Sequence, residues 1–308
     1  MENNTFILEF HILPFFVKAG NKLNILGIIL FFFLYLFGIL INIIIIIVIC
    51  LDLHLHTPMY LFLCNLSVVD MCYTTVTVPK FLYILLSGDN IMSFQQCFLQ
   101  IYFVFMASTS EIIVIFIMAY DRYVAICHPL HYYQKLNKNI CIILMMVIWI
   151  SACANSSLML NCISKMIFCS TTTIHQFFCE AKALFDISCG GRNMFYLLVY
   201  ANCLVFGLIP SASNVISYLK IIRVILRIKS KDGRHKAFST CSSHLTVMLI
   251  YYGSGISVYM TPPLERYNVL ELVLTVFYTT VTPVLNPLIY SLRNNELKRS
   301  IKKLLVWL

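Results

Sequence analysis

Seven long apolar stretches, separated by short polar segments, limit the fold of this chain more strongly than any other feature of its sequence. Each contains about 20 residues or more, enough for an α-helix rising about 1.5 Å per residue to cross roughly 30 Å of hydrocarbon. Transmembrane strands would instead show short alternating segments. The sequence therefore predicts an all-α membrane protein, a seven-transmembrane helix bundle, with spans near residues 24–50, 58–86, 95–125, 140–163, 195–226, 237–261 and 269–291.

The composition excludes a soluble fold and indicates an orientation. The chain is 60% hydrophobic and only 11% charged, too little charge to cover a soluble protein of 308 residues. With the N-terminus outside, 15 of the 22 Lys and Arg residues lie on the cytoplasmic side, as the positive-inside rule requires. The basic residues behind the formal net charge of +9 lie between apolar runs and are not interleaved with aromatic side chains on which bases could stack. This arrangement fits an anionic bilayer surface and excludes nucleic acid as the partner.

We expect a single domain over residues 1–308, with an extracellular N-terminus (1–23), the helix bundle (24–291) and a cytoplasmic tail (292–308). In the tail, basic residues alternate with apolar ones at the spacing of a short amphipathic helix lying on the membrane surface. No short apolar core with a cleavage site precedes the first span, so no cleaved signal peptide is expected. Asn3-Asn4-Thr5 is a glycosylation sequon at Asn3.

The 13 cysteines divide by compartment under this orientation. Cys97, Cys169, Cys179 and Cys189 face outside, where disulfides persist. Four cysteines allow three pairings, and spacing alone does not choose among them. The spacing is also unlike that of zinc ligands, so no metal is expected there.

Polar side chains lie deep inside several apolar stretches. Asp70 and Glu111 each lie 11 or 12 residues from the cytoplasmic end of their stretch, which puts both at a depth of about 16–18 Å. Asn42 falls at a similar level, and Asn286 interrupts the last stretch. These residues predict an interior polar cluster that could hold a cation, with a bound sodium ion near the two acids, or share a proton, and that could also fix helix packing through hydrogen bonds; the roles are not exclusive.

Asp121 and Arg122 stand side by side where the third apolar stretch meets a basic loop. Such charges are costly in hydrocarbon unless they pair or reach water. One interpretation is that they merely end a helix. The other is a switch, in which the acid holds the arginine in one state and releases it to a partner in another. Pro283 and Pro287 favour a kink in the last stretch, which makes that helix a candidate moving part.

No catalytic constellation is present in the sequence, which contains no HExxH, G-x-S-x-G, P-loop or Cys-x-x-Cys motif. We therefore do not expect an enzyme. A transporter or channel that uses Asp70 and Glu111 as an ion path is the rival class. An odd number of spans without visible repetition argues against a transporter built from duplicated halves.

The chain resembles a rhodopsin-like G protein-coupled receptor in Asp121-Arg122-Tyr123 and Asn286-Pro287-Leu288-Ile289-Tyr290, which lie in the third and seventh spans. Along its whole length it is similar, more specifically, to an olfactory (odorant) receptor of the tetrapod type (class II). The strings that carry this resemblance are Leu55 to Tyr60, Met118 to Cys127, Ser217-Tyr218, Lys236 to Leu245, Tyr251-Tyr252-Gly253, Pro283 to Tyr290 and Arg293-Asn294.

The resemblance implies a fold, a location and partners. It implies a plasma-membrane protein with disulfides between Cys97 and Cys179 and between Cys169 and Cys189. It implies odorant binding among the third, fifth, sixth and seventh helices, and coupling to the stimulatory G protein of olfactory neurons, which raises cyclic AMP. The residues that it places in coupling and switching are Asp121, Arg122, Tyr123, Tyr218, Lys236, Asn286, Pro287 and Tyr290.

The outer halves of these helices predict an uncharged ligand site with apolar walls. An aminergic receptor would carry an acid at Val104, and an opsin a lysine in the last span; this chain has neither. A volatile ligand brings few polar atoms, so its affinity comes mainly from apolar contact, at roughly 25 cal/mol per Å² before the costs of association. Ser108 and Tyr259 add hydrogen-bonding groups at the ends of apolar surfaces. The candidate contacts, each of which alone also fits helix packing, are Val104, Phe105, Ser108, Thr109, Asn202, Phe206, Ile256, Tyr259, Tyr278 and Thr279.

A receptor-like protein without an odorant response is a further alternative.

Overall fold

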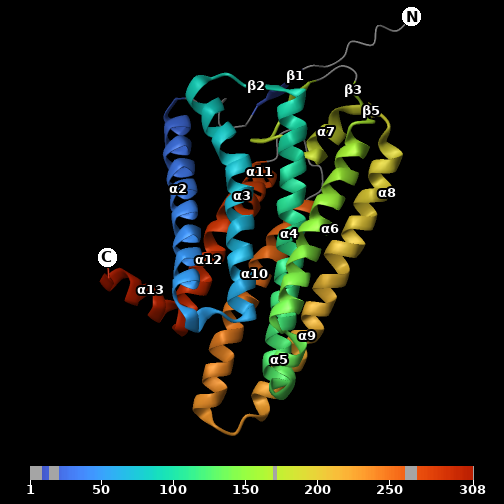
Figure 1. Cartoon of the computed structure of the whole chain (residues 1–308). Helices are drawn as coiled ribbons and strands as arrows, with labels where there is room; N and C mark the ends of the chain where they lie inside the picture. The colour runs from blue at the N-terminus through green and yellow to red at the C-terminus, as the bar shows by residue number, and fades with distance from the viewer. Residues whose placement is uncertain (1–8, 14–20, 169–171, 261–268, 308) are drawn as a thin grey trace, which may run out of the picture.

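The computed structural model describes residues 9–13, 21–168, 172–260 and 269–307. Figure 1 shows long helices packed side by side, with short strands gathered at one end of the bundle. We call this the sheet end, and the opposite end, where α5 and the turn between α9 and α10 lie, the basic end. The helices are α2 (Asn21–Leu51), α3 (Pro58–Ser87), α4 (Phe94–Cys127), α5 (Tyr132–Lys135), α6 (Lys138–Ile163), α7 (Ala181–Ile187), α8 (Arg192–Asn202), α9 (Ile209–Arg227), α10 (Lys231–Met260), α11 (Val269–Val276), α12 (Thr282–Arg293) and α13 (Asn295–Trp307), with short 3-10 turns at η1 (Leu53–Leu55) and η2 (Pro129–His131).

The predicted seven-helix bundle is confirmed, with two of its seven rods made of more than one segment. A π-helical segment, η3 (Cys203–Leu208), joins α8 to α9, and another, η4 (Phe277–Val281), joins α11 to α12. Within the described residues, six helices are long and apolar enough to cross a membrane. The remaining rod, α10, has 30 residues but begins with a polar stretch that carries three Lys and Arg residues.

The helix ends follow from local chemistry. Pro58 stands in the first turn of α3, where its missing N–H costs nothing, and Gly88 ends that helix with a left-handed φ of 73°. Ser93 and Gln96 form a reciprocal capping box at the start of α4, with N–H···O distances of 3.2 and 3.3 Å. The side chain of Asn137 accepts a hydrogen bond from the backbone of the first turn of α6.

Each π-helical segment ends two residues before a proline. Pro210 follows η3 and Pro283 follows η4. Because proline has no N–H and its ring clashes with the carbonyl one turn earlier, the preceding turn widens into i→i+5 hydrogen bonds. The rods that contain these segments are two of the helices to which the resemblance assigns the ligand.

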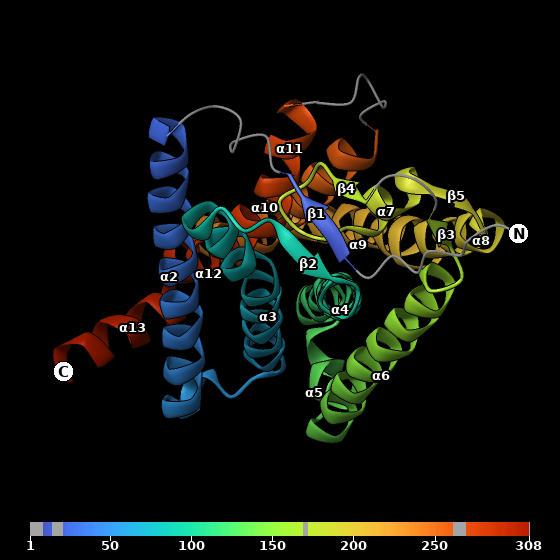
Figure 2. The ribbon, with the colours of Figure 1, turned by 90° about the horizontal axis from the view of Figure 1, so that it is seen from above.

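Helix α4 lies at the centre of the bundle, as the view along the helices shows (Figure 2), and packs against α3, α6 and α9. The largest apolar core surrounds its second half and extends to the basic end. A second apolar cluster lies at the sheet end, around Phe10, Met92 and Cys97.

The sheet end is closed by strands that the sequence did not predict. Strand β1 (Glu9–Ile12) pairs antiparallel with β2 (Ile91–Ser93) and parallel with β4 (Thr173–Ile174). Phe10 and Ile12 of β1 are completely buried, so this N-terminal strand belongs to the core. A second, two-stranded sheet joins β3 (Ile167–Phe168) to β5 (Ser188–Gly190).

A disulfide joins Cys97 of α4 to Cys179, the pairing that the resemblance implies. Cys169 lies outside the described residues, so its pairing with Cys189 stays a prediction. Asn3 lies outside them as well. The predicted helix of the C-terminal tail is present as α13.

Candidate functional site

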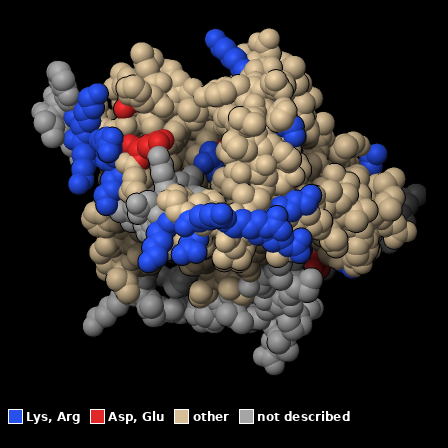
Figure 3. Space-filling model, turned by 90° about the horizontal axis from the view of Figure 1, so that it is seen from below, with Lys and Arg blue, Asp and Glu red and all other residues tan. Residues whose placement is uncertain are grey.

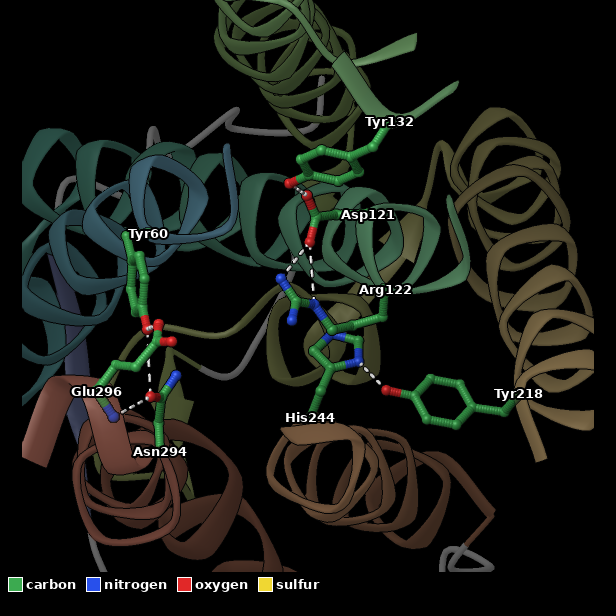
Figure 4. Close-up of polar contacts among 8 residues, drawn as sticks. All are labelled: Tyr60, Asp121, Arg122, Tyr132, Tyr218, His244, Asn294 and Glu296. Carbon is green, nitrogen blue, oxygen red and sulfur yellow. Dashed lines mark hydrogen bonds and ion pairs between the residues drawn. The ribbon is translucent and has the colours of Figure 1, made fainter. Parts of the chain in front are cut away.

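Asp121 and Arg122 form a buried ion pair near the basic end of α4 (Figure 4). The Arg122 Nε donates to Asp121 Oδ2 at 2.9 Å, and the hydroxyl of Tyr132 donates to the other carboxylate oxygen at 2.7 Å. Asp121 is completely buried and would be strongly destabilising without these partners. Helix α4 continues past the pair to Cys127, so the helix does not end at the two charges themselves. The acid holds the arginine, which is the contact from which the switch interpretation starts.

Tyr218 and His244 connect α9 to α10 beside this pair. The Tyr218 hydroxyl lies 2.7 Å from His244 Nδ1, and Figure 4 shows the two side chains meeting close to Arg122. His244 is completely buried. The sequence placed Tyr218 in the switch but did not single out His244, although a histidine inside an apolar stretch near that tyrosine was a usable signal.

The other predicted switch residues lie around the same end but do not all meet. The Tyr123 hydroxyl contacts His128 Nε2 at 3.1 Å, and the Lys220 ammonium lies 5.4 Å from the centre of the Tyr123 ring. Tyr290 is completely buried, and its hydroxyl has no hydrogen-bond partner among the described residues. Pro287 lies inside α12. The Lys236 side chain is outside the described part of the chain.

The surface of the basic end carries a broad band of positive charge (Figure 3). Acidic side chains are few on this face. The band presents a surface for an anionic membrane or an acidic partner. Exposed Lys and Arg side chains from the end of α9 and the start of α10 contribute to it, namely Lys220, Arg223, Arg227, Lys229, Lys231 and Arg234.

The interior polar cluster contains three of the four predicted residues. The Asn286 amide lies 3.2 and 3.3 Å from the two oxygens of Asp70 and 3.3 Å from Glu111 Oε1. Asn42 does not join them: its amide donates to the carbonyls of Gly38 and Pro283, at 3.0 and 3.3 Å, and so ties α2 to α12. Within the described residues, no group of three or more His, Cys, Asp or Glu side chains is placed to hold a metal ion.

Three helices converge on Ser108 in the half of the bundle toward the sheet end. Its own hydroxyl donates to the Val104 carbonyl at 2.8 Å. The Tyr251 hydroxyl of α10 lies 3.4 Å from the Ser108 carbonyl and 3.2 Å from the Tyr278 hydroxyl of η4. Val104 packs against the apolar cluster that contains Phe177. Ser108, Val104 and Tyr278 therefore lie together, with Tyr251 as a member that the sequence did not single out.

Three of the remaining ligand candidates make hydrogen bonds within the bundle. The Thr109 hydroxyl accepts a hydrogen bond from Asn155 of α6 at 2.9 Å, and the buried Thr279 hydroxyl donates to the Thr275 carbonyl at 2.7 Å. The Asn202 amide donates to the Leu198 carbonyl at 2.9 Å. Phe105 is partly buried against the apolar cluster of the sheet end, and Phe206 is half-buried in η3. The side chains of Ile256 and Tyr259 are outside the described residues.

The loop that carries Cys179 covers this region from the sheet end. Phe177 and Phe178 are buried, and the Phe177 ring packs against Phe81 with centroids 5.4 Å apart. The Cys179 backbone N–H donates to Gln100 Oε1 at 2.8 Å. Together with the disulfide, these contacts hold the loop inside the bundle.

Comparisons with known proteins decide the family. A family model described as olfactory receptor matches residues 31–307. Human olfactory receptor 2A12 is 39% identical over 303 residues, which cover 98% of this chain and 97% of the relative. Human olfactory receptor 2T5 is 41% identical over 249 residues, 81% of this chain and 79% of the relative, and mouse olfactory receptor 1M1 is 41% identical over 251 residues, 81% and 80%.

This chain belongs to the olfactory receptor family. It is therefore a multi-pass membrane receptor of the G protein-coupled type and not an enzyme, with odorants and G proteins as its classes of partner. Family membership also decides against the transporter interpretation of Asp70 and Glu111. In this olfactory receptor, the Ser108 region and the Arg122 region lie on the same helix, α4, which offers a direct connection between the two.

Proposed function

We propose that the receptor binds small, volatile, mostly apolar odorants in the half of the bundle toward the sheet end, next to Ser108 and Tyr278. Its N-terminus is extracellular and its C-terminus cytoplasmic. The bound receptor activates a stimulatory, olfactory-type G protein and raises cyclic AMP. The observation that carries the proposal is the buried Asp121–Arg122 pair at the centre of the basic end, with Tyr132 on the acid.

The ligand part of the proposal is supported by what surrounds Ser108. Val104 and Phe105 offer apolar contact, while Tyr251 and Tyr278 offer hydroxyls for the few polar atoms of a volatile molecule. These side chains come from α4, α10 and η4. An odorant lodged among them contacts helices that also reach the basic end, so a small shift of α10 against α4 is transmitted along the helices.

The signalling part is supported by the contacts that hold Arg122. In the resting arrangement the guanidinium is bound to Asp121, and Tyr218 and His244 join α9 to α10 beside it. Movement of α10 breaks the Tyr218–His244 contact and opens the space beside Arg122, so that the G protein can reach the guanidinium and compete with Asp121 for it. An odorant drives this change only through its higher affinity for the active state: shifting a population from 1:99 to 99:1 takes a preference of about 10⁴-fold.

Arg122→Ala tests the signalling part in cells that report cyclic AMP. We expect fewer receptors at the cell surface, because buried Asp121 loses its partner, and no odorant-evoked rise from the receptors that are there, with the signal normalised to the surface amount. Arg223→Ala removes one exposed positive charge at the same end and controls for charge loss alone, so it should keep most of the response. An Arg122→Ala receptor that signals like the wild type would refute the role of Arg122.

Ser108→Ala tests the ligand part. Its hydroxyl bonds to its own helix at 2.8 Å, and Ser157 on the exposed face of α6 makes the same bond at 2.8 Å to the Cys153 carbonyl. Ser157→Ala is therefore a matched control. We expect Ser108→Ala to change the concentration for half-maximal response for some odorants of a panel, and Ser157→Ala to change it for none. Equal effects of the two substitutions would contradict the proposed ligand site.

We further propose that a sodium ion binds near Asp70 and Glu111. Two carboxylates face one amide there, and the buried Asn286 Oδ1 has no hydrogen-bond partner among the described residues. Carboxylate and amide oxygens suit a hard cation. The ion would offset the charge that two buried acids bring into the bundle.

A further inference from the structure

Ser300, in the middle of α13, is joined to the turn between α2 and α3. Its hydroxyl donates to Asp52 Oδ2 at 2.7 Å, across 248 residues of sequence. The other Asp52 oxygen accepts the His54 backbone N–H at 3.1 Å. These two hydrogen bonds hold the pKa of the Asp52 carboxyl below its usual value, so a full negative charge faces Ser300 at neutral pH.

The first turn of α13 is held by separate contacts. Asn294 accepts from the N–H groups of Glu296 and Leu297 and from the Tyr60 hydroxyl, which also donates to Glu296 at 2.9 Å (Figure 4). Leu297 is completely buried. Among the hydrogen bonds of the described residues, the Ser300–Asp52 bond is the one that ties α13 to the bundle beyond Leu297.

The sequence around Ser300 is strongly basic on both sides. Lys298 and Arg299 precede it, and Lys302 and Lys303 follow it; all four side chains are exposed. Protein kinases select substrates by the charge pattern beside the acceptor residue. A serine flanked in this way fits a kinase whose substrate groove is acidic.

We propose that Ser300 is a phosphorylation site for a basic-directed serine kinase, and that the phosphate releases the middle of α13 from Asp52. The inference rests on the proposed orientation, because only a cytoplasmic tail meets kinase and ATP. Ser300 Oγ attacks the γ-phosphorus of ATP, and the bond from that phosphorus to the bridging oxygen breaks. ADP leaves with the electron pair, and the serine proton passes to the base of the kinase.

Phosphorylation turns the attraction between Ser300 and the Asp52 carboxylate into a repulsion. The serine loses the proton that it donated and gains about 1.5 to 2 negative charges opposite a carboxylate. Docked Ser300 is only 9% exposed, so the kinase meets it when α13 has moved away from Asp52. The phosphate then disfavours return, which shifts the population toward the undocked tail.

The phosphorylation step is tested on the full-length receptor in lipid nanodiscs, with ATP and the catalytic domain of protein kinase C. Mass spectrometry should find phosphate on Ser300, and more rapidly in Asp52→Asn, whose tail is held less firmly. Ser230, exposed between Lys229 and Lys231, reports the activity of the kinase on the same chain. Absence of phosphate at Ser300 in both proteins would overturn the site.

The release step is tested without a kinase, by hydrogen exchange of the amides of residues 298–303. We expect Ser300→Asp to exchange about tenfold faster than wild type or more, as loss of a hydrogen bond to a charged group predicts. Ser300→Ala loses the bond without adding charge, so its increase should be smaller. Asp52→Asn should bring the Ser300→Asp protein back to the Ser300→Ala level.

Release is overturned if Ser300→Asp exchanges no faster than Ser300→Ala, or if Asp52→Asn does not slow it. Neither exchange nor phosphorylation in nanodiscs depends on odorant, G protein or orientation. An antibody epitope on the tail, stained in intact and in permeabilised cells, tests the orientation separately. An epitope reached in intact cells would contradict the proposed function and leave the Ser300–Asp52 contact standing.

Discussion

The Tyr218 hydroxyl of α9 lies 2.7 Å from Nδ1 of His244 on α10, and the planes of the two rings are within 13° of each other. Both side chains are buried, so this hydrogen bond forms away from water and next to the Asp121–Arg122 pair. It joins the helix that we propose to move to one that packs against α4. The contact therefore stabilises the observed arrangement of the basic end, which we propose to be the resting one.

Tyr218→Phe removes this bond without removing the ring. A buried histidine nitrogen left without a partner costs about 1–3 kcal/mol of the free energy of unfolding. Because the lost contact belongs to the resting arrangement, basal cyclic AMP per receptor at the surface should rise. Tyr252→Phe is the matched control: its hydroxyl accepts from Asn214 and joins the same two helices away from Arg122. Equal basal activity in both variants would contradict the special role of Tyr218.

Tyr132→Phe removes the hydrogen bond that the α5 hydroxyl donates to Asp121. Asp121 then has one hydrogen-bond partner fewer and is held less firmly in its place beside Arg122. We therefore expect basal cyclic AMP to rise. Burial and the negative charge of Asp121 raise the pKa of Tyr132 above its usual value, so the hydroxyl keeps its proton across physiological pH. The effect should accordingly be the same at pH 6 and pH 8. Tyr133→Phe, at a ring that is 76% exposed, should leave basal cyclic AMP unchanged.

Asp70→Asn and Glu111→Gln test the proposed sodium ion. In the wild type, the thermal unfolding midpoint in detergent should be higher in sodium chloride than in choline chloride at equal ionic strength. Either substitution removes one carboxylate from the site and should reduce or abolish this difference. Glu9→Gln, in β1 and exposed, removes an acid elsewhere and should preserve it. A wild-type midpoint that is insensitive to the cation would contradict the ion.

The bundle could be predicted from the sequence because each helix carries its own local signals. The segment predicted at 58–86 is observed as Pro58–Ser87, since a proline begins it and Gly88 ends it. Strand β1 could not be predicted, because four residues become a strand only when β2 and β4, far along the chain, provide its hydrogen bonds.

Within the candidate site, depth in the membrane was predictable and rotation about the helix axis was not. Counting residues placed Asn42 at the level of Asp70, yet Asn42 points to Pro283. Thr109 was expected toward a ligand and instead accepts from Asn155. Both differences arise because apolar residues surround every face of these helices, so periodicity gives little information on which face meets which neighbour.

The contact between Gly38 and Val284 gives a prediction about packing alone. A Cβ added at Gly38 would lie 2.8 Å from Val284 Cγ2, closer than carbon atoms approach, and valine is stiff at χ1. Gly38→Ala should therefore separate α2 from α12 and cost about 1–3 kcal/mol, although alanine is the better helix former. Thermal unfolding in detergent and the amount at the cell surface measure the loss.

Gly27→Ala in the same helix is the matched control, since its Cβ would meet only Leu85 Cδ1 at 3.9 Å, an ordinary contact. It should leave stability equal or slightly higher. Val284→Ala removes the methyl group with which the Cβ of Gly38→Ala would clash. The double variant should therefore recover part of the lost stability. If Gly38→Ala is as stable as Gly27→Ala, α2 and α12 are not packed as closely as this geometry requires.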